Sequence, residues 1–351
     1  MTDFIPADFR LQFPALAQGH CYLDSAATAL KPQAVIDATV NFYAQEGATV
    51  HRSQHRAAQA LTGEYEQART QVAQWINAPQ SADIVWTRGT TESINLVAQS
   101  WLRPRLQPGD EIIVSQAEHH ANLIPWLMVA AECHAQVITL PLDECGIPDI
   151  TALPHLLNGK TRLLALTQMS NVTGGMPDIG RAIELAHANC TPVMIDGAQG
   201  VVHCPPDVQQ LDIDLYAFSG HKLYGPTGIG VLYGKSELLE DMSPWHGGGK
   251  MLTQASMTGF TPQAVPHRFE AGTPNIAGVI GTSAALAWLK TVDLTAAEKY
   301  AQNLATLAEK QLAQIDGFRS YRCQNSSVLA FDIAGVHHSD LVALLAEQAI
   351  A

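Results

Sequence analysis

Several features that define other classes of protein are missing from this sequence of 351 residues. No apolar run reaches the roughly 18 to 20 residues that a membrane-spanning helix needs. The first residues, Met1–Asp8, are acidic where a secretory signal peptide is basic, so we expect a cytoplasmic protein. Basic residues are also few: 20 Lys and Arg face 33 Asp and Glu, and the net charge of -13 argues against a nucleic-acid partner.

The spacing of the cysteines excludes two further classes of protein. The chain has six cysteines and no CxxC pair, so we predict neither a disulfide framework nor a structural zinc site. We expect most of them to be buried reduced thiols: Cys21, Cys133, Cys145, Cys190, Cys204 and Cys323. The remaining composition, 47% hydrophobic and 15% charged, suits a globular enzyme with one large core and a smaller domain.

From about residue 57 the chain alternates between helical and strand patterns. Seven apolar runs predict strands, over residues 83–87, 111–115, 136–140, 162–167, 192–196, 213–218 and 228–233. Apolar strands linked by helices predict an α/β fold, with a mostly parallel sheet covered by helices on both faces. Ligands of such sheets bind at the carboxyl ends of the strands.

The pattern changes after about residue 285. Long helices are expected over residues 295–315 and 338–350, with one strand over residues 327–333 between them. We therefore predict a large domain over residues 17–287 and a smaller α+β domain formed by residues 1–16 and 288–351.

One lysine has an unusual setting. Lys222 follows an apolar strand, in the stretch Ser219-Gly220-His221-Lys222-Leu223-Tyr224-Gly225-Pro226. A surface lysine does not need such a frame, because its ammonium is solvated at the end of a flexible side chain. A desolvated lysine amine is a natural partner of an aldehyde cofactor, so Lys222 is a candidate Schiff-base residue.

A carboxylate at another strand end supports that interpretation. Asp196 ends the strand over residues 192–196, and Gln199 follows it closely. Taken alone, Asp196 is equally well explained as a turn residue. Together with Lys222 it suits pyridoxal phosphate, whose ring becomes an electron sink when a carboxylate keeps its nitrogen protonated. Gln199 would then lie near the phenolic oxygen of the cofactor.

Two further segments follow predicted strands. In Glu118-His119-His120-Ala121-Asn122 we interpret His119 as an imidazole that stacks on the cofactor ring and moves a proton. A surface loop or a helix cap is the alternative, and adjacent histidines cannot chelate a metal from one helical face, so we predict no metal site. Arg88-Gly89-Thr90-Thr91-Glu92 leads into a helix whose free N–H groups suit a phosphate, although Thr is also an ordinary N-cap.

The glycine motifs do not predict a nucleotide site. The segment 225–230 lacks the Gly-Lys-Ser/Thr ending of a P-loop, and it leads into a strand where a dinucleotide fingerprint leads into a helix. We expect its glycines to let the backbone turn sharply behind Lys222. The segment Gly247-Gly248-Gly249-Lys250 is expected to form a tight loop near the site.

Five motifs, taken in their order along the chain, resemble those of the class V, fold-type I pyridoxal-phosphate enzymes. Within that class the resemblance is to the cysteine desulfurases of the SufS/CsdA type. The motifs are the four segments around Lys222, Asp196, His119 and Thr90, together with Phe269-Glu270-Ala271-Gly272-Thr273-Pro274-Asn275. Tyr22-Leu23-Asp24-Ser25-Ala26-Ala27 adds a match near the start, so the resemblance runs nearly from end to end.

The resemblance implies a role for each site residue. Lys222 would form the internal aldimine, Asp196 would pair with the pyridine nitrogen, His119 would stack on the ring and Gln199 would bond the phenolic oxygen. The phosphate would be bound by Thr90, Thr91, Ser219 and His221. In a two-fold homodimer Thr273 would reach the phosphate of the other subunit's cofactor, and Asn171 would lie near the substrate.

The resemblance also implies a reaction. L-Cysteine displaces Lys222 from the cofactor, the freed amine moves protons between the α-carbon and C4′, and electron withdrawal into the ring weakens the Cβ–Sγ bond. A nucleophilic cysteine takes the sulfur as a persulfide and leaves L-alanine. A SufE-like acceptor protein then carries the sulfur toward iron–sulfur cluster assembly, and cysteine sulfinate and selenocysteine are further expected substrates.

The sequence departs from this family in one motif. The nucleophile of the family lies on an Arg-x-Gly-x-x-Cys loop, which does not occur in these 351 residues, and the arginine expected to bind the substrate carboxylate is missing with it. We therefore expect a fragment of a longer desulfurase that lacks part of the small domain. The alternative is a truncated chain that binds pyridoxal phosphate and forms no persulfide.

Other functions would use the same residues. A selenocysteine lyase, or another β-eliminating or transaminating enzyme, would share Lys222 and Asp196. A catalytically dead subunit or a regulatory binding module built on the same fold is an alternative from a different class.

Overall fold

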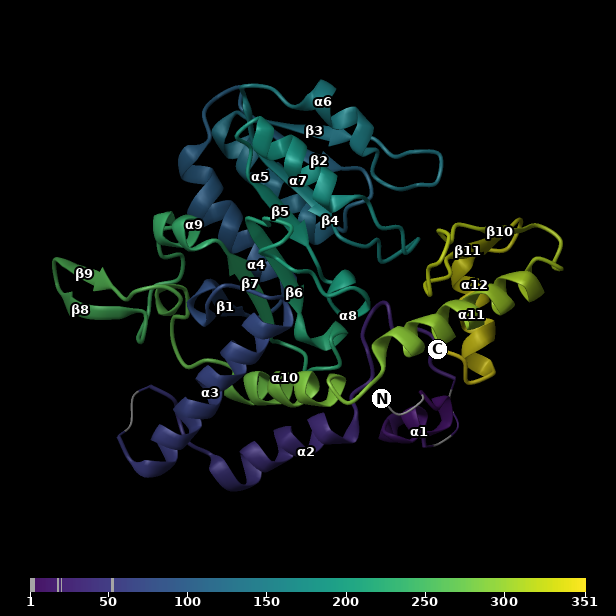
Figure 1. The fold of residues 1–351 in the computed structure, drawn as a ribbon, viewed down its shortest axis with the longest axis horizontal. Helices are drawn as coiled ribbons and strands as arrows, with labels where there is room; N and C mark the ends of the chain where they lie inside the picture. Colours follow the sequence, from purple (N-terminus) through teal and green to yellow (C-terminus); the bar gives the residue numbers. More distant parts are fainter. Residues whose placement is uncertain (1–3, 18, 20, 52–53) are drawn as a thin grey trace.

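The computed structural model describes residues 4–17, 19, 21–51 and 54–351 (Figure 1). Its helices are α1 (Pro6–Leu11), α2 (Gln33–Asn41), α3 (Arg56–Trp75), α4 (Thr90–Val97), α5 (Ile124–Cys133), α6 (Leu153–Leu156), α7 (Ile179–Ala188), α8 (Gly200–His203), α9 (Ser236–Asp241), α10 (Ile276–Leu289), α11 (Leu294–Leu312) and α12 (His338–Glu347). Its strands are β1 (Ile84–Thr87), β2 (Glu111–Ser115), β3 (Gln136–Leu140), β4 (Thr161–Thr167), β5 (Val193–Asp196), β6 (Leu215–Ser219), β7 (Gly230–Gly234), β8 (Leu252–Ser256), β9 (Gly259–Pro262), β10 (Phe318–Ser320) and β11 (Phe331–Ile333). Three short helical turns, η6 (His120–Asn122), η8 (Gly220–Lys222) and η9 (His267–Phe269), lie in or near the predicted site motifs.

The main sheet has seven strands in the order β1-β7-β6-β5-β4-β2-β3. Strands β2 to β6 pair in parallel, whereas β7 runs antiparallel to both of its neighbours, β1 and β6. As a result, β1 points in the same direction as β6. The predicted α/β fold with a mostly parallel seven-stranded sheet is confirmed, and each predicted strand agrees with the observed one to within two residues at either end.

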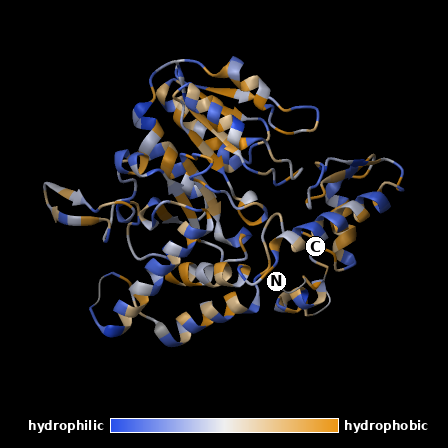
Figure 2. Cartoon of the chain, in the orientation of Figure 1, coloured by the Kyte–Doolittle hydropathy of each residue, from blue (hydrophilic) through white to orange (hydrophobic). Residues whose placement is uncertain are grey.

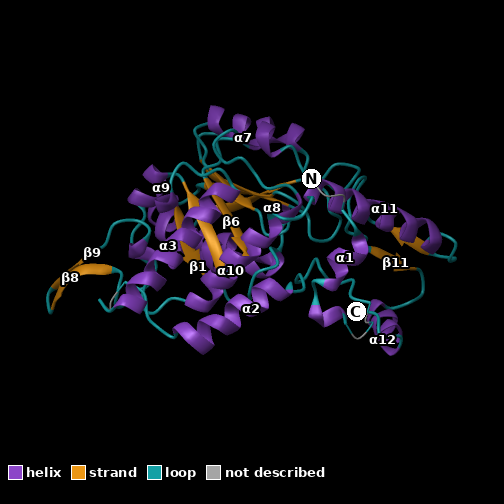
Figure 3. Ribbon diagram, turned by 60° about the horizontal axis from the view of Figure 1, so that its bottom comes forward, coloured by secondary structure: helices purple, strands orange, loops and turns teal. Residues whose placement is uncertain are grey.

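The sheet is buried on both faces because successive residues in the middle of its central strands are apolar. In β4, Leu164 and Leu166 belong to one apolar cluster, and Leu163 and Ala165 belong to another. Successive side chains of a strand point to opposite faces, so the two clusters are the two sides of the sheet. Figure 2 shows the hydrophobic strands at the centre of the large body, and Figure 3 shows helices packed around them.

Helix α3 shows how the apolar pattern places a helix against this core. Leu61 and Tyr65 are buried on its inner face. At its start, the side chain of His55 accepts a hydrogen bond from the backbone N–H of Ala58. Just beyond its end Asn77 has a φ of 53°, a left-handed conformation that stops the helix where the sequence predicts. Among the described residues, every helix is too short or too polar to cross a bilayer.

A smaller group of elements lies at one end of the molecule. In Figure 1, α11, α12 and the β10–β11 hairpin lie together, with α1 nearby. Both predicted helices are present and end three residues early, and only 331–333 of the predicted strand 327–333 forms one. Backbone hydrogen bonds join Cys21 and Leu23 to Ala349 and Ala351. The domain boundaries stay a prediction, and residues 1–3 of the small domain lie outside the described residues.

The β8–β9 hairpin was not predicted from the sequence. Its strands pair antiparallel, and in Figure 1 it extends away from the main body. Met257 at its tip and Phe260 are exposed. The segment 247–250, which we expected to form a tight loop near the site, leads into this hairpin, and the carbonyl of Gly249 accepts a hydrogen bond from the N–H of Gly272 at 2.8 Å.

Candidate active site

The predicted site segments meet at one edge of the sheet. Strands β1, β2, β4, β5 and β6 all point the same way, so their carboxyl ends lie at the same edge. The segments 88–92, 118–122, 196–199 and 219–222 each follow one of these ends. This is the edge at which parallel α/β sheets bind their ligands.

Lys222 lies at the end of η8, immediately after β6. Its Nζ donates a hydrogen bond to Oε1 of the buried Gln199 at 3.3 Å, and none of the described carboxylates forms an ion pair with it. Burial lowers the pKa of Lys222, and the charge of Asp196 opposes this effect only in part. An amine with a lowered pKa is more readily deprotonated, which is what a Schiff-base lysine requires.

Asp196 is buried at the end of β5. Its Oδ1 accepts a hydrogen bond from the N–H of Ala198 at 2.9 Å, and the hydrogen bonds among the described residues leave Oδ2 without a donor. Burial raises the pKa of Asp196, while the bond from Ala198 and the charges of Lys222 and His119 lower it. A buried carboxylate with one free oxygen fits the protonated ring nitrogen of pyridoxal phosphate, which would supply the missing donor.

His119 comes directly before η6, in the loop after β2. Its Nδ1 accepts a hydrogen bond from the N–H of Ala121 at 3.1 Å, so a neutral ring carries its proton on Nε2. The residue is exposed, and its charge acts on Asp196. An exposed, oriented imidazole next to the aspartate fits a residue that stacks on a planar cofactor.

Thr90 and Ser219 form the polar end of the site. The hydroxyl of Ser219 accepts from the N–H of Thr90 at 2.8 Å and bonds its hydroxyl at 2.8 Å, and both residues are buried. The backbones approach closely here, because a Cβ on Gly230 would lie 2.4 Å from Cα of Gly89. Small residues and hydroxyls at the start of α4 fit a phosphate group.

The remaining predicted residues are less closely connected. His221 is half-buried, and its Nδ1 lies 3.2 Å from Oγ1 of Thr28. Thr91 is exposed in the first turn of α4, Asn171 is half-buried in the turn after β4, and Thr273 is exposed before α10. Within the described part of the chain, no hydrogen bond links these last three to Lys222 or Asp196, so their roles stay predictions.

Two site residues received no role from the sequence. Lys31 donates hydrogen bonds to the backbone carbonyls of His221, at 3.1 Å, and of Ala29, and burial lowers the pKa of Lys31 to about 8. Burial, opposed by a hydrogen bond from Asn122 and aided by the charge of Asp196, raises the pKa of Glu118 to about 8. Glu118 belongs to a motif noted in the sequence, whereas Lys31 had no signal beyond its position after the match at residues 22–27.

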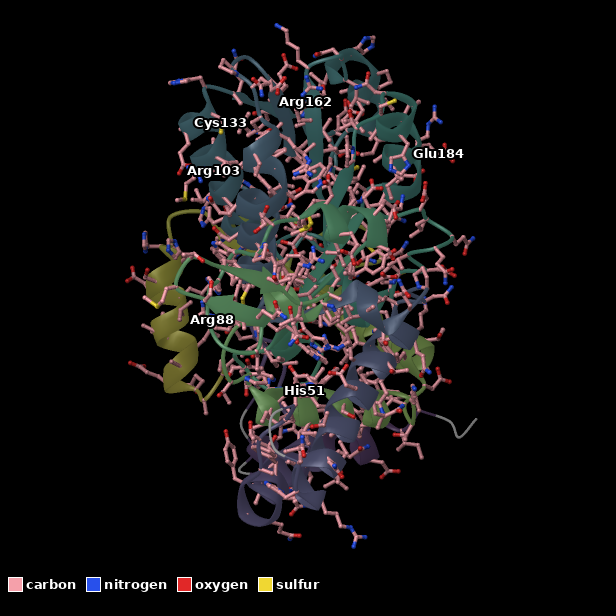
Figure 4. All side chains as sticks on the ribbon, turned by 90° about the vertical axis from the view of Figure 1, so that its left-hand side faces the viewer. His51, Arg88, Arg103, Cys133, Arg162 and Glu184 are labelled. Atoms are coloured by element: carbon pink, nitrogen blue, oxygen red, sulfur yellow. The ribbon has the colours of Figure 1, made fainter. Side chains whose placement is uncertain are left out.

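The expectation that most cysteines are buried is wrong. All six thiols are free, but only Cys323 is buried, and Cys133 is half-buried with its Sγ 3.7 Å from the carbonyl of Arg103 (Figure 4). The others are exposed: Cys21, Cys145, Cys190 and Cys204. Several of them lie in turns or at the ends of helices, as Cys190 does with its φ of 54°, and such positions face solvent whatever the residue type.

One His–Glu–His group has its possible metal ligands within 4.8 Å of one another: His51, Glu66 and His267. His51 is labelled in Figure 4. The carboxylate of Glu66 already accepts from Nε of Arg69 at 2.8 Å and lies 3.1 Å from Nε2 of His51. The guanidinium charge opposes a cation at this point, so we interpret the group as an ion-pair network, and the prediction of no metal site stays a prediction.

Three comparisons relate the chain to known proteins. The model of the Aminotransferase class-V family matches residues 21–351. The cysteine desulfurase CsdA of Escherichia coli strain K12 is 66% identical over 351 residues, which cover 100% of this chain and 88% of that protein. A probable cysteine desulfurase of Vibrio cholerae is 50% identical over 348 residues, covering 97% of this chain and 86% of that protein.

Solved structures give the same result. The crystal structure of E. coli CsdA, in an S-sulfonic acid form, superposes with a TM-score of 0.94 at 66% identity, covering 99% of this chain and 87% of that one. The cystine C–S lyase C-DES, solved with cysteine persulfide, superposes with a TM-score of 0.84 over 97% of this chain and 91% of that one. At 23% identity, that second likeness shows the fold alone.

Proposed function

This chain belongs to the class-V aminotransferase family, and on that premise we propose that it is a pyridoxal-phosphate-dependent cysteine desulfurase. The reaction converts L-cysteine to L-alanine and transfers the sulfur to a protein thiol. Two relatives, 66% and 50% identical, are named as cysteine desulfurases, and the predicted fold type I is confirmed. The observation that carries the proposal is the amine of Lys222 at the carboxyl edge of the sheet, within electrostatic reach of Asp196 and bonded to Gln199.

The chain's own residues divide the chemistry between them. When bound, pyridoxal phosphate supplies an electron sink for the bonds at the substrate's α-carbon. Lys222 would hold the cofactor, and its amine would carry a proton at the site. Asp196 would keep the ring nitrogen protonated, Gln199 would bond the phenolic oxygen, and His119 would stack on the ring with its Nε2–H free to take part in proton transfer.

The assembly is part of the same proposal. Thr90, Thr91, Ser219 and His221 bind the phosphate, Asn171 lies near the substrate, and Thr273 serves the partner subunit's cofactor in a homodimer. Thr273 is exposed, and so are Met257 and Phe260 on the β8–β9 hairpin. Exposed apolar side chains support a second copy of the chain packed against the surface that carries these residues. Light scattering on the purified chain should give twice the monomer mass, and a monomer would contradict this assembly.

The physiological setting follows from the proposed reaction. We propose that the chain works in the cytoplasm and passes its sulfur to a SufE-like acceptor protein, for use in iron–sulfur cluster assembly. Cysteine sulfinate and selenocysteine are proposed as further substrates. We also propose that residues 17–287 form the cofactor-binding domain and that residues 1–16 and 288–351 belong to the small domain.

The proposal is tested by one variant and one set of assays. The purified chain with pyridoxal phosphate should show the visible absorbance of a lysine-bound cofactor and should release alanine from cysteine sulfinate, whose sulfur leaves without attack by a thiolate. Lys222→Ala should lose both, whereas the exposed-lysine control Lys290→Ala should keep both. Turnover of cysteine, selenocysteine and cysteine sulfinate, compared side by side, separates a desulfurase from a selenocysteine lyase.

Two results would contradict the proposal. A parent chain that shows the visible band and releases no alanine from any of the three substrates would bind the cofactor without catalysing the reaction, as a binding module or a chain without the Arg-x-Gly-x-x-Cys loop would. A parent chain without the band would not be a pyridoxal-phosphate protein.

A further inference from the structure

Four residues next to His119 form a continuous chain of hydrogen bonds. Nε1 of Trp126 donates to Oδ1 of Asn122 at 3.0 Å, and Nδ2 of Asn122 donates to Oε2 of Glu118 at 2.6 Å. The other carboxyl oxygen, Oε1, accepts from the backbone N–H of Thr167 at 2.7 Å. Asn122 and Trp126 are completely buried. The chain therefore runs through the protein interior from α5 to the end of β4.

This chain of bonds encloses the turn that carries His119. Glu118 and Asn122 stand on either side of the turn, and the N–H of Asn122 donates to the carbonyl of His119 at 2.8 Å. At the other end, Thr167 is the register partner of Asp196 in the β4–β5 pair. The bond from Thr167 thus joins Glu118 to β4 beside the aspartate of the site.

The donors at the two ends of this chain of hydrogen bonds fix the direction of every bond in it. The indole of Trp126 and the backbone N–H of Thr167 are donors only. Asn122 must turn its oxygen to the indole, so its NH₂ group faces Glu118, which then has to accept at both oxygens. Both bonds favour the ionised carboxylate and oppose the burial that raises the pKa of Glu118 to about 8.

We propose that Glu118 is a positioning residue. By bonding the turn that carries His119 to β4, Glu118 holds the imidazole over the cofactor ring. The inference rests on the proposed function, because it assumes that His119 stacks on pyridoxal phosphate. The position of the imidazole is set by the order of donors and acceptors along Trp126, Asn122, Glu118 and Thr167. The bulk of the glutamate does not set it.

The pattern predicts both a defect and its repair. In Glu118→Gln an NH₂ group replaces Oε2 and faces the NH₂ group of Asn122, so two donors meet. If the amide of Asn122 turned over, its NH₂ group would instead face the indole N–H of Trp126, which is also a donor. In Glu118→Gln/Asn122→Asp the new carboxylate accepts from both neighbours, and the pattern is complete again. In Glu118→Gln/Trp126→Phe the indole donor is absent, so Asn122 can turn over without conflict.

The test uses the cofactor-loaded chain at a pH above the pKa of Glu118. We expect Glu118→Gln to weaken the visible circular dichroism of the bound cofactor, which reports how the ring is held, and to speed cofactor release. Turnover should fall by about 10²-fold, since misplacing a catalytic group by an ångström costs this much. Either double variant should recover most of each signal. Asp37→Asn, which disturbs an exposed bond of the same i to i+4 type from Gln33 at 2.6 Å, should change nothing.

Each outcome has a defined meaning. Glu118→Gln with unchanged dichroism and turnover would overturn the inference, and so would two folded double variants that behave like the single one. If one double variant does not fold, the other decides. A parent chain without the visible band contradicts the proposed function instead, so the two failures are distinguishable.

Discussion

Replacing Arg69 with methionine should destabilise the chain more than replacing any surface arginine, because Arg69 is a charge buried in the core. It is 1% exposed, and its NH1 and NH2 donate to the two oxygens of Glu270 at 2.6 and 3.0 Å. Nε bonds Glu66 at 2.8 Å, and NH1 also donates to the carbonyl of Ile84 at 2.8 Å. A fifth bond runs from the second terminal nitrogen to the other oxygen of Glu66 at 3.3 Å, and Arg69→Met keeps the apolar stem and removes all five.

The size of the effect follows from what is left behind. Glu270 is 7% exposed and would remain as a buried carboxylate without its cation. Removing one partner of a buried pair costs about 3 to 5 kcal/mol. By contrast, Arg181 forms an i to i+3 pair on the surface with Glu184, which is labelled in Figure 4. The two side chains are 57% and 68% exposed, and Arg181→Met should cost at most about 1 kcal/mol.

The effect should also depend on pH. Burial pushes the pKa of Glu270 up, but the charge of Arg69 and the hydrogen bonds bring it below its ordinary value. A lowered pKa stabilises the fold above the unfolded value of about 4.3, and this contribution is lost as the pH falls through the folded value. In Arg69→Met only the bonds from His267 and from the N–H of Trp86 still oppose burial, so the pKa of Glu270 rises and protonation of Glu270 stabilises the variant before it affects the parent. The gap between parent and variant should therefore narrow as the pH falls from 7 toward 5.

Urea unfolding followed by far-ultraviolet circular dichroism, at both pH values, measures this gap. The double variant Arg69→Met/Glu270→Met should recover part of the loss, because no unpaired charge remains. A loss below about 1 kcal/mol for Arg69→Met at pH 7 would mean that the pair is worth no more than a surface one. A gap that does not change with pH would show that Glu270 is not the group responsible.

Three further outcomes are expected. Ser219→Ala removes the hydroxyl that bonds both the N–H and the hydroxyl of Thr90, so the dissociation constant for pyridoxal phosphate, measured by fluorescence titration, should rise about tenfold; an unchanged constant would separate Ser219 from the phosphate. Gly230→Ala should lower the free energy of unfolding, measured in urea, by about 1 to 3 kcal/mol, because its Cβ would lie 2.4 Å from Cα of Gly89. Wild-type stability would mean that the backbone at Gly89 can move away from β7 at no cost. The thiols of Cys21, Cys145, Cys190 and Cys204 should react quickly with a thiol reagent in the native chain and that of Cys323 only on unfolding; rapid labelling of Cys323, located by mass spectrometry, would contradict its burial.

The sheet was predictable because the middle of each strand is a run of apolar residues. Runs such as Val193-Met194-Ile195 carry enough signal to place β5 within one residue. The β8–β9 hairpin lacked that signal: four of the five residues of β8 are exposed, so no core selects their type. The strand expected over residues 327–333 was too long because its apolar residues are only half-buried and a sequence pattern does not report depth.

Residues of the site could be predicted from the sequence where they lie at or next to the end of a strand. Asp196 ends β5, and Lys222 and His119 follow β6 and β2. These three strands run in the same direction, so the fold class alone brings the three residues to one edge. The role inferred for Glu118 depends on its bond to Thr167, 49 residues away, and on the direction of the bonds from Asn122 and Trp126. The burial and charges that shift the pKa values of Glu118, Asp196 and Lys222 likewise come from separate strand ends. A motif can therefore name the residues of such a site, whereas the proton affinity of each one is a property of the packed edge.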